Sequence, residues 1–210
     1  MYGLLQNGIK LINLTGPRGV GKTEIALRVA EYARERYRFS RFLFIEFHKM
    51  GDCSESACLD KLAAVFLSSS EGTGGVTGGR DIDETVERIR QHLEGRDEEV
   101  LLVMDGLDAW MTVAGGRRDF LQRLVTQLRQ GLGQVVAMLL TSSTRLEADT
   151  DSRVIRLEGL LDKCAANLFA IRAPRQMESD EFYLDANHNQ DPLKAFSKSK
   201  LLQSMKVSEE

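Results

Sequence analysis

The sequence predicts an α/β protein, a three-layer sandwich in which a five-stranded, mainly parallel sheet carries helices on both faces. Two observations lead to this prediction. The strand-sized apolar runs lack the polar alternation of a half-solvated sheet, and segments with apolar residues at helical spacing separate them. The chain has 210 residues, of which 42% are hydrophobic, so it is long enough for one domain with a full core and a small appendage.

Strands and helices alternate along the chain. The expected strands are residues 9–15, 42–47, 100–104, 135–140 and 154–157. Four helices are expected between them, beginning at Lys22, after Ser54, after Asp81 and near Phe120, and a last helical stripe covers residues 161–169. Ser54 and Asp81 are of the types that cap helix N-termini, because their side chains accept a hydrogen bond from a backbone N–H of the first turn.

The composition changes in two places. The Ser/Gly-rich stretch 68–79 predicts a linker, because no strand precedes its glycines and no lysine follows them. After Ala173 the chain becomes polar, with only a weak helical pattern behind Pro192. We therefore expect a domain over residues 1–172 and, over residues 173–210, either a partial helical lid or a partly disordered tail.

Charge and cysteine content disfavour several classes of function, but they do not exclude a local basic patch. With 28 Lys and Arg against 31 Asp and Glu, the net charge of −3 favours neither a nucleic-acid groove nor an anionic membrane surface. The start of the chain lacks a signal pattern, so we expect a soluble, cytoplasmic protein. Three cysteines without C-x-x-C spacing and three scattered histidines favour neither a zinc site nor disulfides, and we interpret the cysteines as small apolar residues on helix faces.

One glycine-rich loop carries specific chemistry. The pattern G-x-x-x-x-G-K-[ST] is matched by Gly16, Pro17, Arg18, Gly19, Val20, Gly21, Lys22 and Thr23, with Glu24 directly after them. The loop lies between a strand and a helix, where backbone N–H groups and the positive end of the helix bind phosphate. Lys22 is expected to reach the β- and γ-phosphates, and the Thr23 hydroxyl to hold Mg²⁺. The pattern predicts a P-loop NTPase fold that binds ATP or ADP with Mg²⁺.

Acidic residues follow the most apolar strand. Asp105 stands at its carboxyl end, where a second Mg²⁺ ligand opposite Thr23 is expected, because ligands of open α/β sheets bind outside those strand ends. Asp108 is either a base toward water or a helix-capping or solvated carboxylate. Arg145 either reaches a γ-phosphate or is an exposed loop arginine. Trp110 is interpreted as a packing anchor.

These motifs resemble the STAND class of P-loop NTPases, signalling ATPases that include NB-ARC and NACHT domains. The loop G-P-R-G-V-G-K-T-E-I-A resembles the NB-ARC form, V-L-L-V-M-D-G-L-D resembles the acidic motif of NACHT domains, and L-L-T-S at residues 139–142 resembles the sensor strand of both. The resemblance covers roughly residues 9–172. It implies that the sensor strand lies between the phosphate-loop strand and the Asp105 strand, and that ADP is exchanged for ATP to trigger assembly.

Several departures from the family pattern bear on activity. Ser143 stands where the sensor arginine is expected, and Arg145 is shifted by two residues. Gly106 replaces a second acid, and Ala109 replaces a glutamate of the NACHT motif, so the resemblance implies slow hydrolysis. The chain reads as a truncated member, ending before the Gly-x-Pro element and winged-helix domain of the family. For a domain without its lid we expect weak nucleotide affinity.

Three hypotheses of function follow. The first is an ATP/ADP-binding switch module with slow or negligible turnover, in which Lys22, Asp105, Asp108 and Arg145 carry any catalysis. The second is a vestigial nucleotide-binding fragment that acts as a protein-interaction module, with a protein partner or self-association. The third, an ATPase coupled to nucleic acid, is disfavoured by the near-neutral charge.

Overall fold

The computed structural model describes residues 1–50, 54–67, 81–111, 117–147 and 152–161, with Cys164, Ala165 and Leu168. The helices are α1 (Tyr2–Gln6), α2 (Lys22–Glu35), α3 (Glu55–Leu67), α4 (Ile82–Leu93), α5 (Asp108–Met111) and α6 (Arg117–Leu132), with a 3-10 turn η1 (Phe47–Lys49). The strands are β1 (Leu11–Thr15), β2 (Arg41–Glu46), β3 (Val100–Asp105), β4 (Val136–Ser142) and β5 (Arg153–Arg156).

Residues 1–157 form one compact unit and residues 158–210 form a second. In the second unit, Cys164, Ala165 and Leu168 are helical. The stretch 68–79, the tail 173–210, Cys53 and most of the stripe 161–169 lie outside the described residues. The division at residue 172 therefore stays a prediction.

The five strands form one sheet in the order β2-β3-β4-β1-β5, and every pairing is parallel. The α/β prediction is confirmed, and β4 lies between β1 and β3, as the family resemblance implies. The register pairs Thr15 with Ser142 and Glu46 with Asp105, while Met104 faces Leu140. Because neighbouring strands run in the same direction, the carboxyl ends of β1, β3 and β4 meet at one edge of the sheet.

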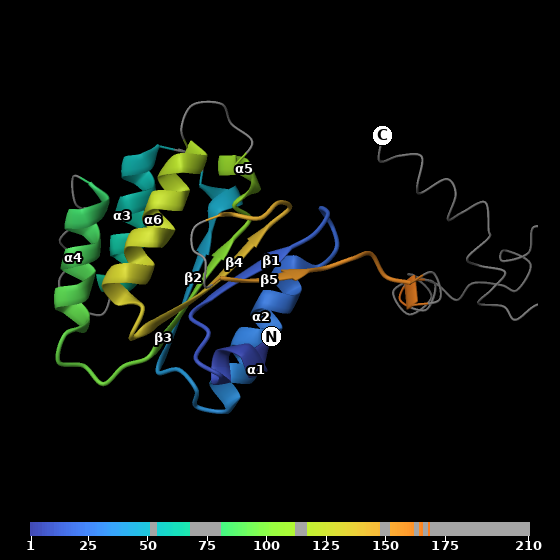
Figure 1. The fold of residues 1–210 in the computed structure, drawn as a ribbon, viewed down its shortest axis with the longest axis horizontal. Coiled ribbons are helices and arrows are strands. Elements are labelled where there is room, and N and C mark those ends of the chain that lie inside the picture. Colours follow the sequence, from blue (N-terminus) through green and yellow to red (C-terminus); the bar gives the residue numbers. More distant parts are fainter. Residues whose placement is uncertain are drawn as a thin grey trace, which may run out of the picture. The chain divides into compact units, whose positions relative to one another are not determined.

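The strands β1, β3 and β4 are buried on both faces, which explains why they show no polar alternation, whereas the edge strand β5 is largely exposed. Figure 1 shows α3, α4 and α6 on one side of the sheet and α1 and α2 on the other. Along β3, Leu102 and Met104 face the first layer, while Leu101 and Val103 face the second. Burying one such leucine contributes about 1.5–3 kcal/mol, so both layers stabilise the sheet that positions the site.

The predicted helix starts are confirmed by their capping bonds. The Ser54 hydroxyl accepts a hydrogen bond from the backbone N–H of Ala57 at 3.2 Å, and Asp81 accepts one from that of Glu84 at 2.8 Å. Two interpretations of single residues also hold. Cys58 is 2% exposed inside the α3 layer, and Trp110 is fully buried, with its ring edge-to-face against Phe47. The same interpretation is not met at Cys164, which is helical but exposed.

Three short elements were not predicted. Helices α1 and α5 and the turn η1 span five, four and three residues, which is too short for helical periodicity to be visible. Among the described residues, none of the helices has the length and apolar character that spanning a bilayer requires.

Candidate functional site

The glycine-rich loop joins β1 to α2 at the carboxyl edge of the sheet. Three of its glycines, Gly16, Gly19 and Gly21, have positive φ angles of 155°, 81° and 93°. Gly16 is also required sterically, because a Cβ there would lie 2.6 Å from the backbone oxygen of Leu157, which follows β5. The loop therefore depends on glycine both for its backbone conformation and for its approach to the neighbouring strand.

Lys22 opens helix α2 and is 9% exposed. Its ammonium donates hydrogen bonds to the backbone oxygens of Gly16 at 2.8 Å and Pro17 at 3.0 Å. The charge is thus buried but satisfied by carbonyls of the loop itself. This arrangement holds a cation at the loop, where the carbonyl bonds can be exchanged for bonds to an anion.

Thr23 and Asp105 meet across the site although 82 residues separate them. The Thr23 hydroxyl lies 2.8 and 2.9 Å from the two carboxylate oxygens of Asp105, whose side chain is almost completely buried. Thr141, at the end of β4, donates a further hydrogen bond to Oδ1 of this carboxylate at 2.6 Å. The Thr141 hydroxyl in turn accepts one from the backbone N–H of Gly106 at 2.9 Å. Residues of α2 and β4 therefore hold the carboxylate at the end of β3 in place.

This donor set fits Mg²⁺. The ion prefers oxygen ligands, and it is usually bound by one or two carboxylates together with water and substrate phosphates. Thr23 and Asp105 supply one hydroxyl and one carboxylate within hydrogen-bonding distance of each other. Among the described residues, no three or more His, Cys, Asp or Glu side chains are grouped so that they could hold a metal ion by themselves.

Asp108 is the first residue of α5 and is half-buried. Its carboxylate accepts hydrogen bonds from both the backbone N–H and the hydroxyl of Ser143, each at 2.5 Å. The carboxylate therefore ties the start of α5 to the segment after β4. The sequence left Asp108 as a base toward water, a helix cap or a solvated carboxylate. The observed contact is most similar to a cap, but Asp108 caps the turn after β4 and not its own helix α5.

A cavity of about 770 Å³ brings these groups together, a size typical of small-molecule sites. Its lining comprises Arg18, Gly19, Gly21, Lys22, Thr23, Glu24, His48, Asp105, Gly106, Asp108, Ala109, Thr141 and Ser143. Gly16, Pro17 and Val20 belong to the loop but not to this lining. Arg145 does not line the cavity either and is exposed beyond β4, as in the alternative of a loop arginine.

His48 also lines this cavity and was not predicted from the sequence. The His48 ring follows β2, and its Nδ1 lies 3.8 Å from a carboxylate oxygen of Asp105. Gly106 allows this approach, because at its φ of 72° a Cβ would lie 2.9 Å from the same nitrogen. His48 follows the carboxyl end of β2, which pairs with β3, and residues at such strand ends are candidates for the site.

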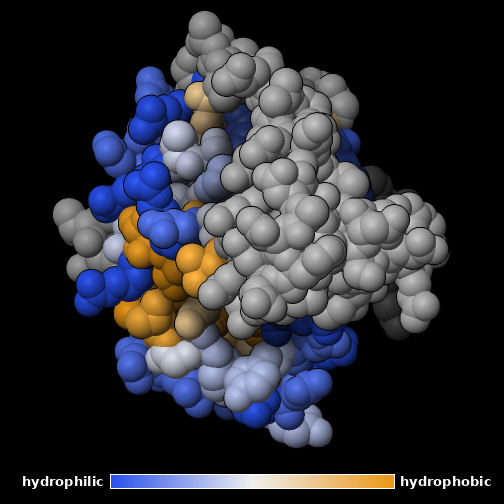
Figure 2. Space-filling view, turned by 90° about the vertical axis from the view of Figure 1, so that its right-hand side faces the viewer, coloured by the Kyte–Doolittle hydropathy of each residue, from blue (hydrophilic) through white to orange (hydrophobic). Residues whose placement is uncertain are grey.

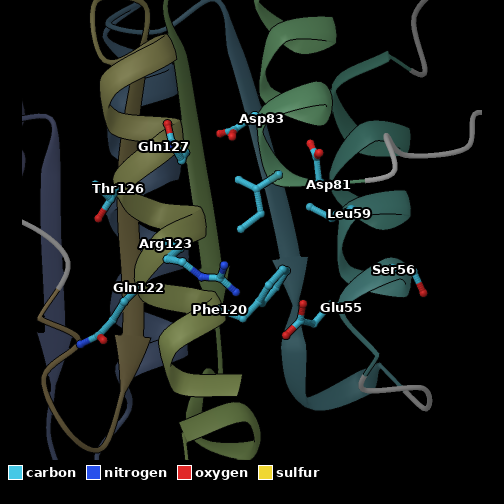
Figure 3. Close-up of a pocket in the computed structure, with 11 residues that line it drawn as sticks. Glu55, Ser56, Leu59, Asp81, Asp83, Phe120, Gln122, Arg123, Thr126 and Gln127 are labelled. Carbon is cyan, nitrogen blue, oxygen red and sulfur yellow. The ribbon is translucent and has the colours of Figure 1, made fainter. Parts of the chain in front are cut away.

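A second cavity, of about 450 Å³, lies between α3, α4 and α6. Figure 3 shows Arg123 reaching from α6 into this space beside Phe120, with Asp81 and Asp83 at the start of α4. The Asp81 carboxylate is engaged in capping α4. This cavity lies on the helical layer, away from the strand ends, and contains no residue of the glycine-rich loop, so the 770 Å³ cavity is the candidate functional site.

Known proteins support the same assignment of fold. The NACHT domain family matches residues 10–170. The structure of the ORC2 protein of Aeropyrum pernix, in ADPNP–ADP complexes, is similar with a TM-score of 0.56 and 15% identity, over 99% of this chain and 60% of that one. The STAND protein PH0952 of Pyrococcus horikoshii, which has a tetratricopeptide repeat sensor, has a TM-score of 0.54 and 14% identity, over 96% and 27%.

The Walker-type ATPase PABY2304 of Pyrococcus abyssi is also similar, with a TM-score of 0.55 and 11% identity, over 99% of this chain and 70% of that one. No curated protein matches the sequence. At these identities the structural likeness shows the fold alone. The chain spans 60% and 27% of the length of the first two of these structures.

Proposed function

Because the chain belongs to the NACHT domain family, P-loop NTPases of the STAND class, we propose that it is an ATP/ADP-binding switch module with slow or negligible hydrolysis. The observation that carries this proposal is the contact of the Thr23 hydroxyl with both oxygens of Asp105. A loop threonine and a strand-end carboxylate at this distance are the pair that a phosphate-bound Mg²⁺ requires.

In this proposal the loop from Gly16 to Thr23 surrounds the phosphates with its backbone N–H groups. Lys22 exchanges its carbonyl partners for phosphate oxygens, and Glu24 lies at the rim of the cavity. Thr23 and Asp105 would hold Mg²⁺, which when bound would offset the negative charge of the phosphates. Thr141 and Gly106 keep the Asp105 carboxylate oriented toward the loop.

Slow turnover is supported by the contacts of the remaining candidates. The Asp108 carboxylate accepts two hydrogen bonds from Ser143 at Oδ1, so one of its two oxygens is engaged with the segment after β4. Arg145 lies outside the cavity lining, and among the described residues Arg18 of the loop is the arginine that lines it. Without an arginine from the segment after β4 in the lining, we expect turnover on the order of 10⁻³ per second or below.

A thermal-shift experiment tests nucleotide binding. At about 100 times Kd, a ligand adds about 2.7 kcal/mol to the free energy of unfolding. For a domain of this size we expect Mg-ADP and Mg-ATP to raise Tm by roughly 5–10 °C. At the same nucleotide concentration the Lys22→Ala variant should shift by only about 1 °C, and Lys61→Ala, which removes an exposed lysine of α3, should behave as wild type. A wild-type protein indifferent to millimolar nucleotide contradicts the proposal.

A vestigial site in a protein-interaction module is the second candidate. Two observations favour it. The Lys22 ammonium is already hydrogen-bonded to carbonyls of its own loop, and two large hydrophobic side chains of α2, Leu27 and Tyr32, are 44% and 42% exposed. Figure 2 shows apolar residues gathered in one patch on the face it views. For such a module, Lys22→Ala leaves capture of a protein partner or a second copy unchanged. Loss of capture in that variant favours the switch instead.

A further inference from the structure

A third cavity, of about 340 Å³, lies at the opposite edge of the sheet, where β1 and β5 begin. Three cationic side chains from three separate elements line it. Lys10 precedes β1, Arg129 belongs to the last turns of α6, and Arg153 opens β5. Among the described residues that line the cavity there is no carboxylate; the others are Ser152 and residues 7–9.

Lys10 is held deep in this group of cations. Its side chain is only 15% exposed, and its ammonium donates to the backbone oxygen of Gln134 at 3.0 Å. A carboxylate oxygen of Glu99 lies 3.5 Å away, but Glu99 also pairs with Arg38. One carboxylate, that of Glu99, is therefore shared by Lys10 and Arg38. Burial and the charges of Arg38 and Arg129 lower the pKa of Lys10, in keeping with a positive potential around it.

The chemistry of this lining selects its ligand. Guanidinium groups present forked N–H donors that match phosphate oxygens, and an ammonium adds a compact point charge. A small cavity with three cations suits a compact anion that carries several phosphates. We propose that the cavity lined by Lys10, Arg129 and Arg153 binds such an anion, an inositol polyphosphate in solution or the same headgroup on a lipid.

This site is separate from the proposed nucleotide site. Lys10 precedes β1 and the glycine-rich loop follows it, so the five residues of the strand separate the two by about 16 Å. No residue lines both cavities. A phosphate-bearing ligand at this edge therefore does not compete with nucleotide.

Calorimetric titration of the full chain with inositol hexakisphosphate, without Mg²⁺, tests the proposal. We expect saturable binding that Arg153→Gln and Lys10→Gln each weaken about tenfold, the effect of losing one charge-assisted hydrogen bond. Arg156→Gln is the matched control, because it removes an exposed arginine from the other end of the same strand. Lys22→Ala should bind as wild type, which shows that the probe is not in the glycine-rich loop.

A flotation assay separates the two sources of phosphate. If the ligand is a lipid headgroup, the wild-type protein floats with phosphatidylcholine vesicles that contain about 5 mol% phosphatidylinositol 4,5-bisphosphate, and the Arg153→Gln variant floats less. Binding of the soluble probe alone supports a free ligand. The proposal is overturned by absence of saturable binding at millimolar probe, by equal weakening in Arg156→Gln and Arg153→Gln, or by loss of binding in Lys22→Ala.

Discussion

The two halves of the candidate nucleotide site are built differently. The loop half is local, since the Lys22 ammonium bonds to carbonyls five and six residues before it. The acidic half is assembled from distant segments: Thr141 bonds to Asp105 across 36 residues, and Ser143 bonds to Asp108 across 35. The bonds of the Lys22 ammonium form within the loop itself, whereas the acidic half exists only when β3 and β4 pair. We therefore expect changes in the loop to alter ligand affinity, and changes at the strand ends to alter metal dependence and stability.

The largest effect is expected from Lys22→Ala in the loop half. Removing an ammonium that bonds to phosphate should weaken ADP binding about 100-fold, or ~3 kcal/mol, with and without Mg²⁺. Isothermal titration calorimetry measures this, with Lys61→Ala as the control. Equal affinities in Lys22→Ala and wild type would mean that the loop is not the binding element.

Gly106→Ala in the acidic half should lower the free energy of unfolding by about 1–3 kcal/mol. The new Cβ combines a positive φ with a contact 2.9 Å from His48 Nδ1. Gly8→Ala is a matched control, because Gly8 has a φ of 78° and a Cβ added there would meet no atom within 4 Å. Urea unfolding compares the two, and an equal cost at both positions would show that the His48 contact is unimportant.

Asp105→Asn should remove the Mg²⁺ dependence of nucleotide affinity while leaving metal-free binding intact. We expect Mg²⁺ to strengthen ATP binding about tenfold in wild type, ~1.4 kcal/mol, and to have no effect in the variant. Titrations with Mg²⁺ and with EDTA measure the difference. Asp119→Asn, at an exposed position in the first turn of α6, is the control. If Asp105→Asn keeps the wild-type response to Mg²⁺, Asp105 is not a ligand of the metal.

The smallest effect is expected from Arg145→Ala. Its side chain is exposed and outside the cavity lining, so ATP and ADP affinities should change by less than about twofold, within about 0.5 kcal/mol. Parallel titrations with the two nucleotides test this. A selective loss of ATP affinity would show that Arg145 reaches the γ-phosphate and therefore belongs to the acidic half of the site.

The sequence predicted the layers and strands well because their signals are local. Apolar runs mark strands that are buried on both faces, and the caps at Ser54 and Asp81 act within three residues. Helices α1 and α5 were missed because one turn shows no periodicity. The place of His48 beside Asp105 was missed because it depends on β2 pairing with β3.

The sequence by itself determined the glycine-rich loop, the helix that follows it and the buried strand that ends at Asp105, since each is encoded by neighbouring residues. The motifs predicted that Asp105 lies opposite Thr23; only the tertiary structure decided that the two side chains are in contact, that Asp108 is engaged by Ser143 and that Arg145 lies outside the cavity lining. Those outcomes depend on strand order and register, which arise from packing between residues far apart in the chain. Local propensity contains no record of such pairings.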